Sequence, residues 1–229
     1  MWLLIALKTL IKGDVKMKVL ELYSGTECLS NAFRAKGHEC FTVDWDEKFP
    51  SSLHCDISKL TAKEILEKFG RPDVIWVGTD CTTFSVAAIS KHRRKNKETG
   101  NLDPVSDYAK KCDETNKHVW ELIDELQPQI YIWENPRGGL RSMTYMQRAN
   151  RQTTTYCQYG FPYMKPTDFF SNVDLELKPP CKNGDPCHER APRGSRHGLQ
   201  GIKGSDNRSV YPEELCKHMV ERCEELIIK

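Results

Sequence analysis

The stretch that decides the fold is Asp73-Val-Ile-Trp-Val-Gly-Thr-Asp-Cys-Thr-Thr-Phe-Ser85. Residues 73–77 form a short apolar, β-branched run between Pro72 and Gly78, the pattern of a buried parallel strand that ends in a loop. Cys81 therefore follows the carboxyl end of a strand, the edge at which open α/β sheets bind ligands. At this position the thiol is a candidate nucleophile, although free cysteines are also common as buried structural groups.

The size and composition of the chain limit its class. Its 229 residues are enough for one α/β domain with a small appendage, and a net charge of +2 is too small to indicate a partner. The ten cysteines occur in a chain of this size without a secretory leader, so we expect reduced thiols and a cytoplasmic location. Residues 1–11 are apolar but too short to span a bilayer, so no membrane is expected. Residues 1–16 are interpreted as a separable N-terminal extension.

A first βα unit is predicted near the N-terminus. Residues 19–24 have the buried-strand pattern and end in Gly25, and residues 26–36 are expected to form a helix. Backbone amides at the start of such a helix are available to an anionic group. The next strand, residues 39–43, ends in Asp44 at the offset where an acid holds ribose hydroxyls, or where it serves as a turn residue. Trp45 beside it is suited to stack on a purine ring.

A third strand end carries His54-Cys-Asp-Ile57. Asp56 is suited to accept a hydrogen bond from an exocyclic amine such as adenine N6, or equally to cap the helix predicted over residues 60–69. Further along, apolar residues between 105 and 126 recur at helical spacing, and we interpret them as a core-facing stripe without chemistry.

Residues 129–133 form another buried strand, which delivers Glu134 to the same edge of the sheet as Cys81. A carboxylate at the end of an apolar strand is costly unless it is hydrogen-bonded or used in chemistry. A thiol and a carboxyl group at neighbouring strand ends therefore indicate a reaction.

Together these segments resemble the C5-cytosine DNA methyltransferase family, most closely its small phage-type members. The resemblance covers most of the chain from Val19 onward. It rests on Leu20-Glu-Leu-Tyr-Ser-Gly25, Asp44-Trp45, Asp56-Ile57, Asp80-Cys81, Glu134-Asn-Pro136, Gln147-Arg-Ala-Asn-Arg151 and Asn207-Arg-Ser-Val-Tyr-Pro212, in that order.

The resemblance implies a doubly wound, mostly parallel α/β sheet of the S-adenosylmethionine-dependent methyltransferase type. Residues 17–160 would form the catalytic, cofactor-binding domain, and residues 161–206 a small, loop-rich target-recognition element. Residues 207–229 would supply a C-terminal motif and a helix that returns to the catalytic domain.

The implied activity is methylation of cytosine C5 in DNA by a monomer in the cytoplasm, the host cytoplasm if the chain is phage-encoded. By analogy with the family, Cys81 attacks C6 of a cytosine flipped out of the duplex, Glu134 contacts N3 and the amino group, and Arg151 contacts O2. S-adenosylmethionine would be held by Tyr23, Ser24, Gly25, Asp44, Trp45, Asp56, Ile57, Gly78, Ser209 and Val210. For Arg151, a surface arginine at a helix end is the alternative.

Two basic segments are candidates for contact with DNA phosphates. One follows Cys81 and the other lies in the predicted recognition element, where the shortness of the element predicts limited sequence specificity. The expected DNA-binding side chains are Lys91, Arg93, Arg94, Lys95, Arg193 and Arg196.

The main departure from the family is Asp80, which stands where the family has a proline before its nucleophile. An adjacent carboxylate tends to raise the pKa of a thiol and to repel phosphate. Two alternatives therefore stay open: a C5-pyrimidine-modifying enzyme with another donor or acceptor, such as a free nucleotide or RNA, and a silenced DNA-binding homologue.

No metal is assigned to the site. One cluster nevertheless leaves two interpretations open, a structural zinc site or a turn fixed by Gly184 and Pro186 with thiols packed beneath it. Its members are Cys157, Cys181, Cys187 and His188.

Overall fold

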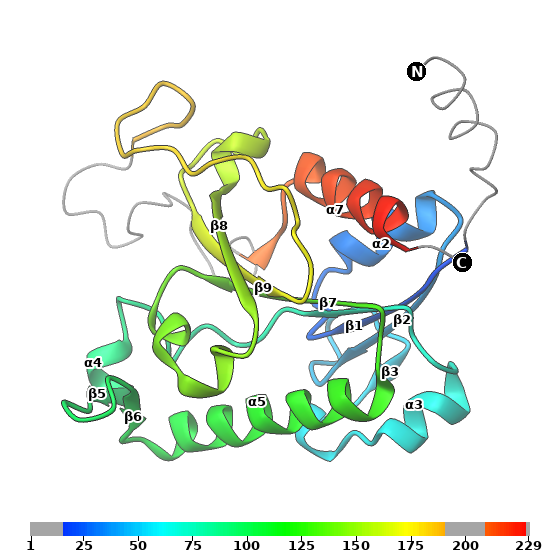
Figure 1. Ribbon diagram of the computed structural model, residues 1–229, viewed down its shortest axis with the longest axis horizontal. Coiled ribbons are helices and arrows are strands. Elements are labelled where there is room, and N and C mark those ends of the chain that lie inside the picture. The colour runs from blue at the N-terminus through cyan, green and yellow to red at the C-terminus, as the bar shows by residue number, and fades with distance from the viewer. Residues whose placement is uncertain (1–15, 191–208, 228–229) are drawn as a thin grey trace.

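The computed structural model describes residues 16–190 and 209–227, and its centre is a seven-stranded sheet with the order β3-β2-β1-β4-β7-β9-β8 (Figure 1). Five strands are parallel, β9 runs antiparallel to β7, and β8 runs antiparallel to β9. The strands are β1 (Lys18–Leu22), β2 (Glu39–Asp44), β3 (Leu53–His54), β4 (Val74–Val77), β7 (Ile130–Pro136), β8 (Asn150–Thr155) and β9 (Pro166–Ser171). This topology confirms the predicted doubly wound α/β class.

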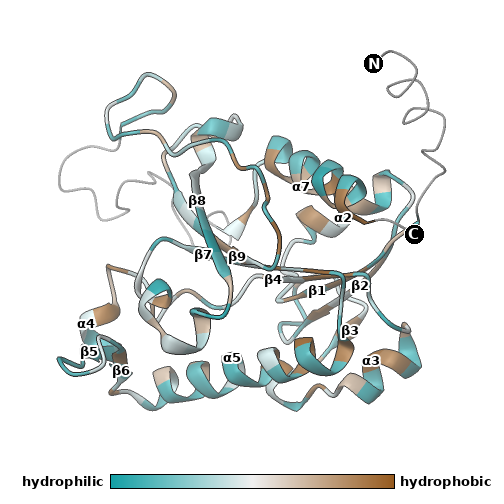
Figure 2. Cartoon of the chain, in the orientation of Figure 1, coloured by the Kyte–Doolittle hydropathy of each residue, from teal (hydrophilic) through white to brown (hydrophobic). Residues whose placement is uncertain are grey.

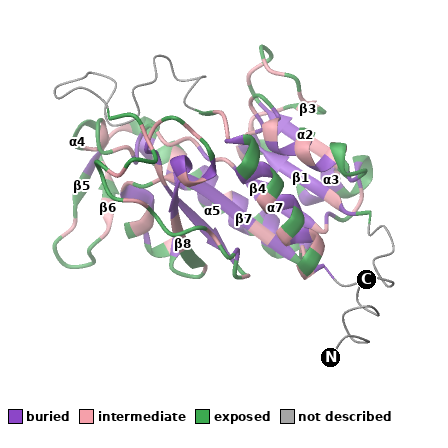
Figure 3. Cartoon of the chain, turned by 90° about the horizontal axis from the view of Figure 1, so that it is seen from above, coloured by how far each residue is buried: buried purple, intermediate pink, exposed green. Residues whose placement is uncertain are grey.

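Helices cover both faces of the sheet. Figure 1 shows α2 (Cys28–Ala35) and α7 (Glu213–Leu226) side by side on one face, and α3 (Ala62–Lys68) and α5 (Asp107–Leu126) on the other. Each helix turns its apolar side toward the sheet (Figure 2), so two cores form, one above and one below it. The inner strands β1, β4, β7 and β9 are buried along most of their length (Figure 3), whereas β3 and the first residues of β8, at the two ends of the sheet, are partly exposed.

The strand register brings four chain segments to one edge of the sheet. Leu22 of β1 lies level with Val43 of β2 and Val77 of β4, and Val77 lies level with Trp133 of β7. The next residue of each strand therefore emerges at the same carboxyl edge. These residues are Tyr23, Asp44, Gly78 and Glu134.

A small subdomain follows the fourth strand. It consists of α4 (Ile89–His92) and an antiparallel ribbon of β5 (Arg93–Lys95) and β6 (Leu102–Pro104), which lies near the N-terminal end of α5. The short helices η1 (Ile57–Lys59), η2 (Gly139–Ser142), η3 (Thr144–Met146) and η4 (Tyr156–Tyr159) complete the described elements. Within residues 16–190 and 209–227, no helix has both the length and the apolar composition needed to cross a membrane.

β8 ends at Thr155, level with Pro166 of β9, and a further backbone hydrogen bond joins the Tyr156 amide to the Lys165 carbonyl at 3.1 Å. Residues 156–159 then form η4. β9 lies beyond the expected domain boundary at residue 160 and is the sixth strand of the main sheet, so the sheet continues past that boundary.

Candidate active site

Cys81 lies in a tight loop after β4. The backbone oxygen of Cys81 accepts hydrogen bonds from the amides of Phe84 (3.1 Å) and Ser85 (2.8 Å), so the loop turns sharply at this residue. The thiol is free and its residue is partly buried. The neighbouring turn after β7 packs against the loop, since the Gly139 amide donates to the Phe84 carbonyl at 2.7 Å. A Cβ on Gly139 would approach the side chains of Ile89 and Leu102 to 2.7 Å, so glycine permits this packing.

Glu134, at the end of β7, is buried and has specific partners. It is 5% exposed, and the Tyr156 hydroxyl donates a hydrogen bond to its Oε1 at 3.0 Å. Lys165 is 3% exposed, and its Nζ lies 4.4 Å from the centre of the Tyr156 ring. A buried carboxyl group, a phenol and an ammonium group therefore form one cluster at the edge of the sheet where Cys81 emerges.

The pKa values connect this cluster to the thiol. Burial raises the pKa of Cys81, the carboxylates of Glu134 and Asp80 raise it further, and the ammonium group of Lys165 opposes them. Burial likewise raises the pKa of Glu134, against the effects of Lys165 and Tyr156. Both groups therefore favour the protonated form more than free side chains do, and the Glu134 carboxylate is one of the charges that act on the Cys81 thiol.

Asp80 is fixed in position by two local contacts. The Tyr108 hydroxyl donates a hydrogen bond to its Oδ2, and the Thr82 amide donates to its Oδ1 at 2.7 Å. Tyr108 belongs to the helical stripe that the sequence analysis interpreted as core, yet it is 45% exposed and reaches into the Cys81 loop. The stripe therefore does carry one side chain that contacts the candidate site.

The turn after β1 has the geometry of a ligand-binding turn. Tyr23 and Glu27 adopt left-handed backbone angles (φ 60° and 55°), as does Gly25 (φ 47°). Asp44 fixes the turn, because its Oδ2 accepts from the Gly25 amide at 2.8 Å while its Oδ1 accepts from the Asp46 amide at 3.0 Å. Both carboxylate oxygens of Asp44 therefore accept hydrogen bonds from backbone amides, so Asp44 acts as a turn residue here.

Two further features of this edge fit a polar ligand with an aromatic ring. The buried hydroxyl of Ser24 has no hydrogen-bond partner among the described residues, which is unusual for a group that is 5% exposed. Trp45 is 69% exposed directly after Asp44, so its indole face is open to stacking. These side chains fit the predicted cofactor site at the ends of β1 and β2.

Asp56 and Ile57 mark the end of β3. Asp56 caps η1, because its Oδ1 accepts from the Ser58 amide at 3.1 Å, and it pairs with Lys111 at 2.9 Å. The Lys111 ammonium group and Ser58 lower the pKa of Asp56 to about 2. The helix predicted over residues 60–69 is capped instead by the Thr61 hydroxyl, and Ile57 is buried.

Similarity to known proteins is found among solved structures. No family model and no curated protein match this chain. Among solved structures, the S. pombe Dnmt2 methyltransferase matches with a TM-score of 0.47 at 15% identity, over 71% of this chain and 52% of that chain. A triple mutant of Spodoptera frugiperda DNMT2 matches with a TM-score of 0.44 at 16% identity, over 73% and 54% of the two chains. The Entamoeba histolytica methyltransferase EhMeth matches with 0.47 at 12% identity, over 71% and 55%.

The chain thus spans about half of the length of these solved structures. The functional assignment therefore rests on the side chains of the site.

The C-terminal segment returns to the sheet through Tyr211. Its hydroxyl accepts a hydrogen bond from the buried Trp76 indole at 3.2 Å, and a Cβ on Gly78 would meet this hydroxyl at 2.6 Å. Gly78 is therefore explained by close packing against Tyr211, a residue that the sequence analysis did not include in the cofactor site. Ser209 is exposed, and Val210 lines a groove that also contains residues 159–161.

Lys165 is a cation at this edge of the sheet that sequence reasoning missed. Arg151 lies in β8 opposite Phe170 and is exposed, whereas Lys165 acts electrostatically on both Cys81 and Glu134. The reason is topological: β9 is antiparallel, so the residue that precedes it lies at the carboxyl edge of the parallel strands. The signal in the sequence was a lysine directly before the short apolar strand that contains Phe169 and Phe170.

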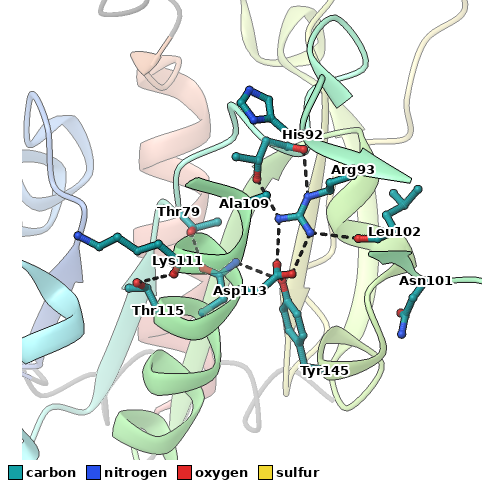
Figure 4. Close-up of polar contacts among 12 residues, drawn as sticks. Thr79, His92, Arg93, Asn101, Leu102, Ala109, Lys111, Asp113, Thr115 and Tyr145 are labelled. Carbon is teal, nitrogen blue, oxygen red and sulfur yellow. Dashed lines mark hydrogen bonds and ion pairs between the residues drawn. The ribbon is translucent and has the colours of Figure 1, made fainter. Parts of the chain in front are cut away.

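The expected DNA contact through Arg93 is wrong, because this side chain is buried. Arg93 is 2% exposed and forms a bidentate pair with Asp113, with two N–O distances of 2.9 Å (Figure 4). It also donates to the Thr83 carbonyl at 3.1 Å and to the Thr83 hydroxyl at 2.9 Å, so it anchors the loop that carries Cys81. All of its donors are used inside the protein, and none is left for a phosphate.

The Arg93 anchor belongs to a chain of hydrogen bonds that ends at the catalytic edge. Asp113 accepts from Tyr145 at 3.0 Å, Asn116 donates to Tyr145 at 3.3 Å, and the Thr79 hydroxyl donates to Asn116 at 2.7 Å. Figure 4 shows this network between β5, α5 and the loop after β4. The Thr79 carbonyl in turn accepts from Asn135 at 3.2 Å, beside Glu134.

The other predicted DNA-binding residues are placed differently. Lys91, Arg94 and Lys95 are exposed on the same small subdomain as Arg93. Arg193 and Arg196 lie outside the described residues.

Replacement of Arg93 by alanine should destabilise the fold strongly, because it leaves the carboxylate of Asp113 buried without a counter-charge. We expect Arg93→Ala to lower the free energy of unfolding by about 3–5 kcal/mol, measured by urea denaturation. The matched control is Arg94→Ala, an exposed neighbour, which should change it by less than about 0.5 kcal/mol. Equal effects of the two changes would contradict the anchoring role.

Removal of the Asp80 charge should make Cys81 more reactive. We expect Asp80→Asn to increase the rate of iodoacetamide labelling at Cys81 roughly threefold near pH 8, because loss of the carboxylate charge lowers the pKa of the thiol and raises its thiolate fraction. Mass spectrometry of the Cys81 peptide separates this thiol from the other nine. Glu67→Gln removes an exposed carboxylate from α3 and serves as the control; a similar gain there, or none in Asp80→Asn, contradicts the assignment.

Proposed function

We propose that this chain is an S-adenosylmethionine-dependent methyltransferase that methylates cytosine C5 in DNA through a covalent adduct with Cys81. The observation that carries the proposal is the placement of Cys81, after β4, within the electrostatic reach of the buried Glu134 at the end of the adjacent strand β7. A thiol and a protonatable carboxyl group that act on the same substrate ring are suited to nucleophilic addition to a pyrimidine.

The chemistry follows from these two groups. The ring carbon C5 of cytosine is a weak nucleophile, so the Cys81 sulfur forms a bond to C6 while Glu134 protonates or hydrogen-bonds N3. The electron pair of the 5,6 double bond moves onto C5, which would then bond to the methyl group of S-adenosylmethionine, with S-adenosylhomocysteine as the leaving group. Loss of the C5 proton to solvent re-forms the double bond, breaks the bond between sulfur and C6 and returns the thiolate, while N3 gives its proton back to Glu134.

The raised pKa of Glu134 suits this role. A carboxyl group whose pKa is raised is protonated in a larger fraction of molecules at neutral pH, and can therefore donate to N3. Tyr156 fixes the orientation of the carboxyl group through its hydrogen bond to Oε1, and Lys165 supplies positive charge beside it. Lys165 also opposes the effects that raise the pKa of Cys81, and so favours the thiolate.

The donor would be held at the ends of β1 and β2. Ser24 offers a buried hydroxyl with no hydrogen-bond partner among the described residues, Gly25 has open space where a Cβ would stand, and Trp45 offers an open ring face. The acceptor is proposed to be DNA because Lys91, Arg94 and Lys95 gather on the subdomain that follows Cys81. The ten free cysteines fit the proposed cytoplasmic location.

The test is transfer of a radiolabelled methyl group from the donor to duplex DNA, to RNA and to dCMP in parallel. We expect the label on duplex DNA, in the pyrimidine ring and not on the exocyclic amine. Transfer only to RNA or dCMP would replace the proposed acceptor, and transfer to none of the three would leave the chain as a binding protein.

Glu134→Gln should lower turnover about 10²–10⁴-fold, because glutamine cannot protonate N3, while the affinity for the donor stays unchanged. Steady-state kinetics and calorimetric titration of the donor measure the two quantities. Glu125→Gln, on the far helix α5, is the control and should keep full turnover. If Glu134→Gln turned over at the rate of the unchanged protein, its role as proton donor would be wrong.

A further inference from the structure

A cluster of three thiols and one imidazole lies outside the proposed active site. The ligand atoms of its four members all lie within 4.8 Å of one another, although they come from two segments of the chain. Cys157 belongs to η4, after β8, and the other three belong to the loop that follows β9. The members are Cys157, Cys181, Cys187 and His188.

From this arrangement we propose that the cluster binds one zinc ion as a structural site. A tetrahedral ion with Zn–S bonds of about 2.3 Å and a Zn–N bond of about 2.0 Å separates its sulfur ligands by about 3.7 Å, and sulfur from nitrogen by about 3.5 Å. The Sγ atoms of Cys157 and Cys181 lie 3.2 Å apart, and those of Cys157 and Cys187 lie 3.7 Å apart. His188 Nδ1 lies 3.7 Å from the Cys181 sulfur and 3.5 Å from the Cys187 sulfur.

These separations favour a metal over a disulfide. A disulfide requires sulfur atoms about 2.05 Å apart, and it would use only two of the three thiols. All ten cysteines are free, and four ligands at the corners of one tetrahedron complete the coordination of a zinc ion without water. The site is therefore closed and non-catalytic.

The surrounding backbone prepares the loop for this role. Gly184 adopts φ +100°. The Lys182 amide donates a hydrogen bond to Asp185 Oδ2 at 2.7 Å, and the Asp185 amide donates one to the Lys182 carbonyl at 3.1 Å. The Thr155 hydroxyl accepts from the Cys181 amide at 3.1 Å and so positions that ligand. Coordination through Nδ1 leaves the ring proton of His188 on Nε2, so the long contact of Nε2 with the Gly184 amide (3.4 Å) is not kept in the zinc-bound form.

Zinc would connect this loop to the proposed catalytic cluster. Cys157 directly follows Tyr156, the residue that donates a hydrogen bond to Glu134. The ion therefore fixes η4, which no strand pairing holds, against the loop of residues 181–188. The inference depends only on the four ligands, and it stands whether or not the chain methylates DNA.

The experiment measures zinc in the full chain, purified under reducing conditions from cells supplied with zinc. We expect about one zinc ion per chain by elemental mass spectrometry, and thiolate-to-metal charge-transfer absorption when cobalt replaces zinc. Cys181→Ser should lose the metal, and Cys55→Ser, which changes a thiol outside the cluster, should keep it. A strong chelator should lower the melting temperature of the unchanged protein but not that of Cys181→Ser.

A second pair of variants separates coordination from simple misfolding. Loss of an outer-shell partner weakens metal binding roughly 10–100-fold, and His188→Ala, which removes a direct ligand, should weaken zinc binding by more than this. His188→Cys should retain about one zinc ion in a four-cysteine site. Zinc below about one ion in ten chains for the unchanged protein, a Cys157–Cys181 disulfide in its peptide map, or equal zinc content in Cys181→Ser would each overturn the proposal.

Discussion

The structure of this protein depends on one costly placement, the burial of the Glu134 carboxyl group at the end of an apolar strand. A buried carboxyl group without partners would lower the stability of the fold, and the chain avoids this with the Tyr156 hydroxyl and the Lys165 ammonium group. Both partners come from the antiparallel extension of the sheet, beyond the parallel strands. The extension formed by β8 and β9 therefore completes the catalytic edge as well as the sheet.

The same constraint explains how the loop after β4 is built. A thiol that must meet a neighbouring carboxyl group needs a fixed backbone, and here the loop is held from two sides. Gly139 allows the turn after β7 to pack directly on Phe84, and Arg93 binds both the carbonyl and the hydroxyl of Thr83. An arginine that looks like a DNA contact in the sequence is thus a structural group that positions the proposed nucleophile.

The parallel strands and the edge at which they meet could be predicted from local sequence, because parallel strands in this fold are short apolar runs that end in glycine or a polar residue. The strand before Gly78 and the strand before Glu134 both follow this pattern, and their meeting at one edge follows from parallel topology. Lys165 could not be found in this way, because its place depends on β9 being antiparallel. Arg93 was misread because a run of basic residues does not show which one points inward.

The proposed zinc ligands could be predicted only in part. Their residue types were visible in the sequence, but the spacing from Cys157 to Cys181 carries no information until β8 and β9 pair and bring the two segments together. Asp44 is a similar case. Its position in the sequence predicted a carboxylate at the ligand-binding edge of the sheet, whereas its hydrogen bonds to the Gly25 and Asp46 amides depend on the left-handed turn after β1.

The central claim is that the Cys81 sulfur bonds to the pyrimidine ring, and mass spectrometry of a trapped complex tests it most directly. Duplex DNA containing 5-fluorocytosine lacks the C5 proton whose loss releases the enzyme, so the adduct accumulates once the methyl group has been transferred. The account predicts a covalent protein–DNA complex that requires S-adenosylmethionine, with the nucleotide mapped to the peptide that contains Cys81. A complex mapped to another residue, or methylated DNA without any adduct, would contradict it.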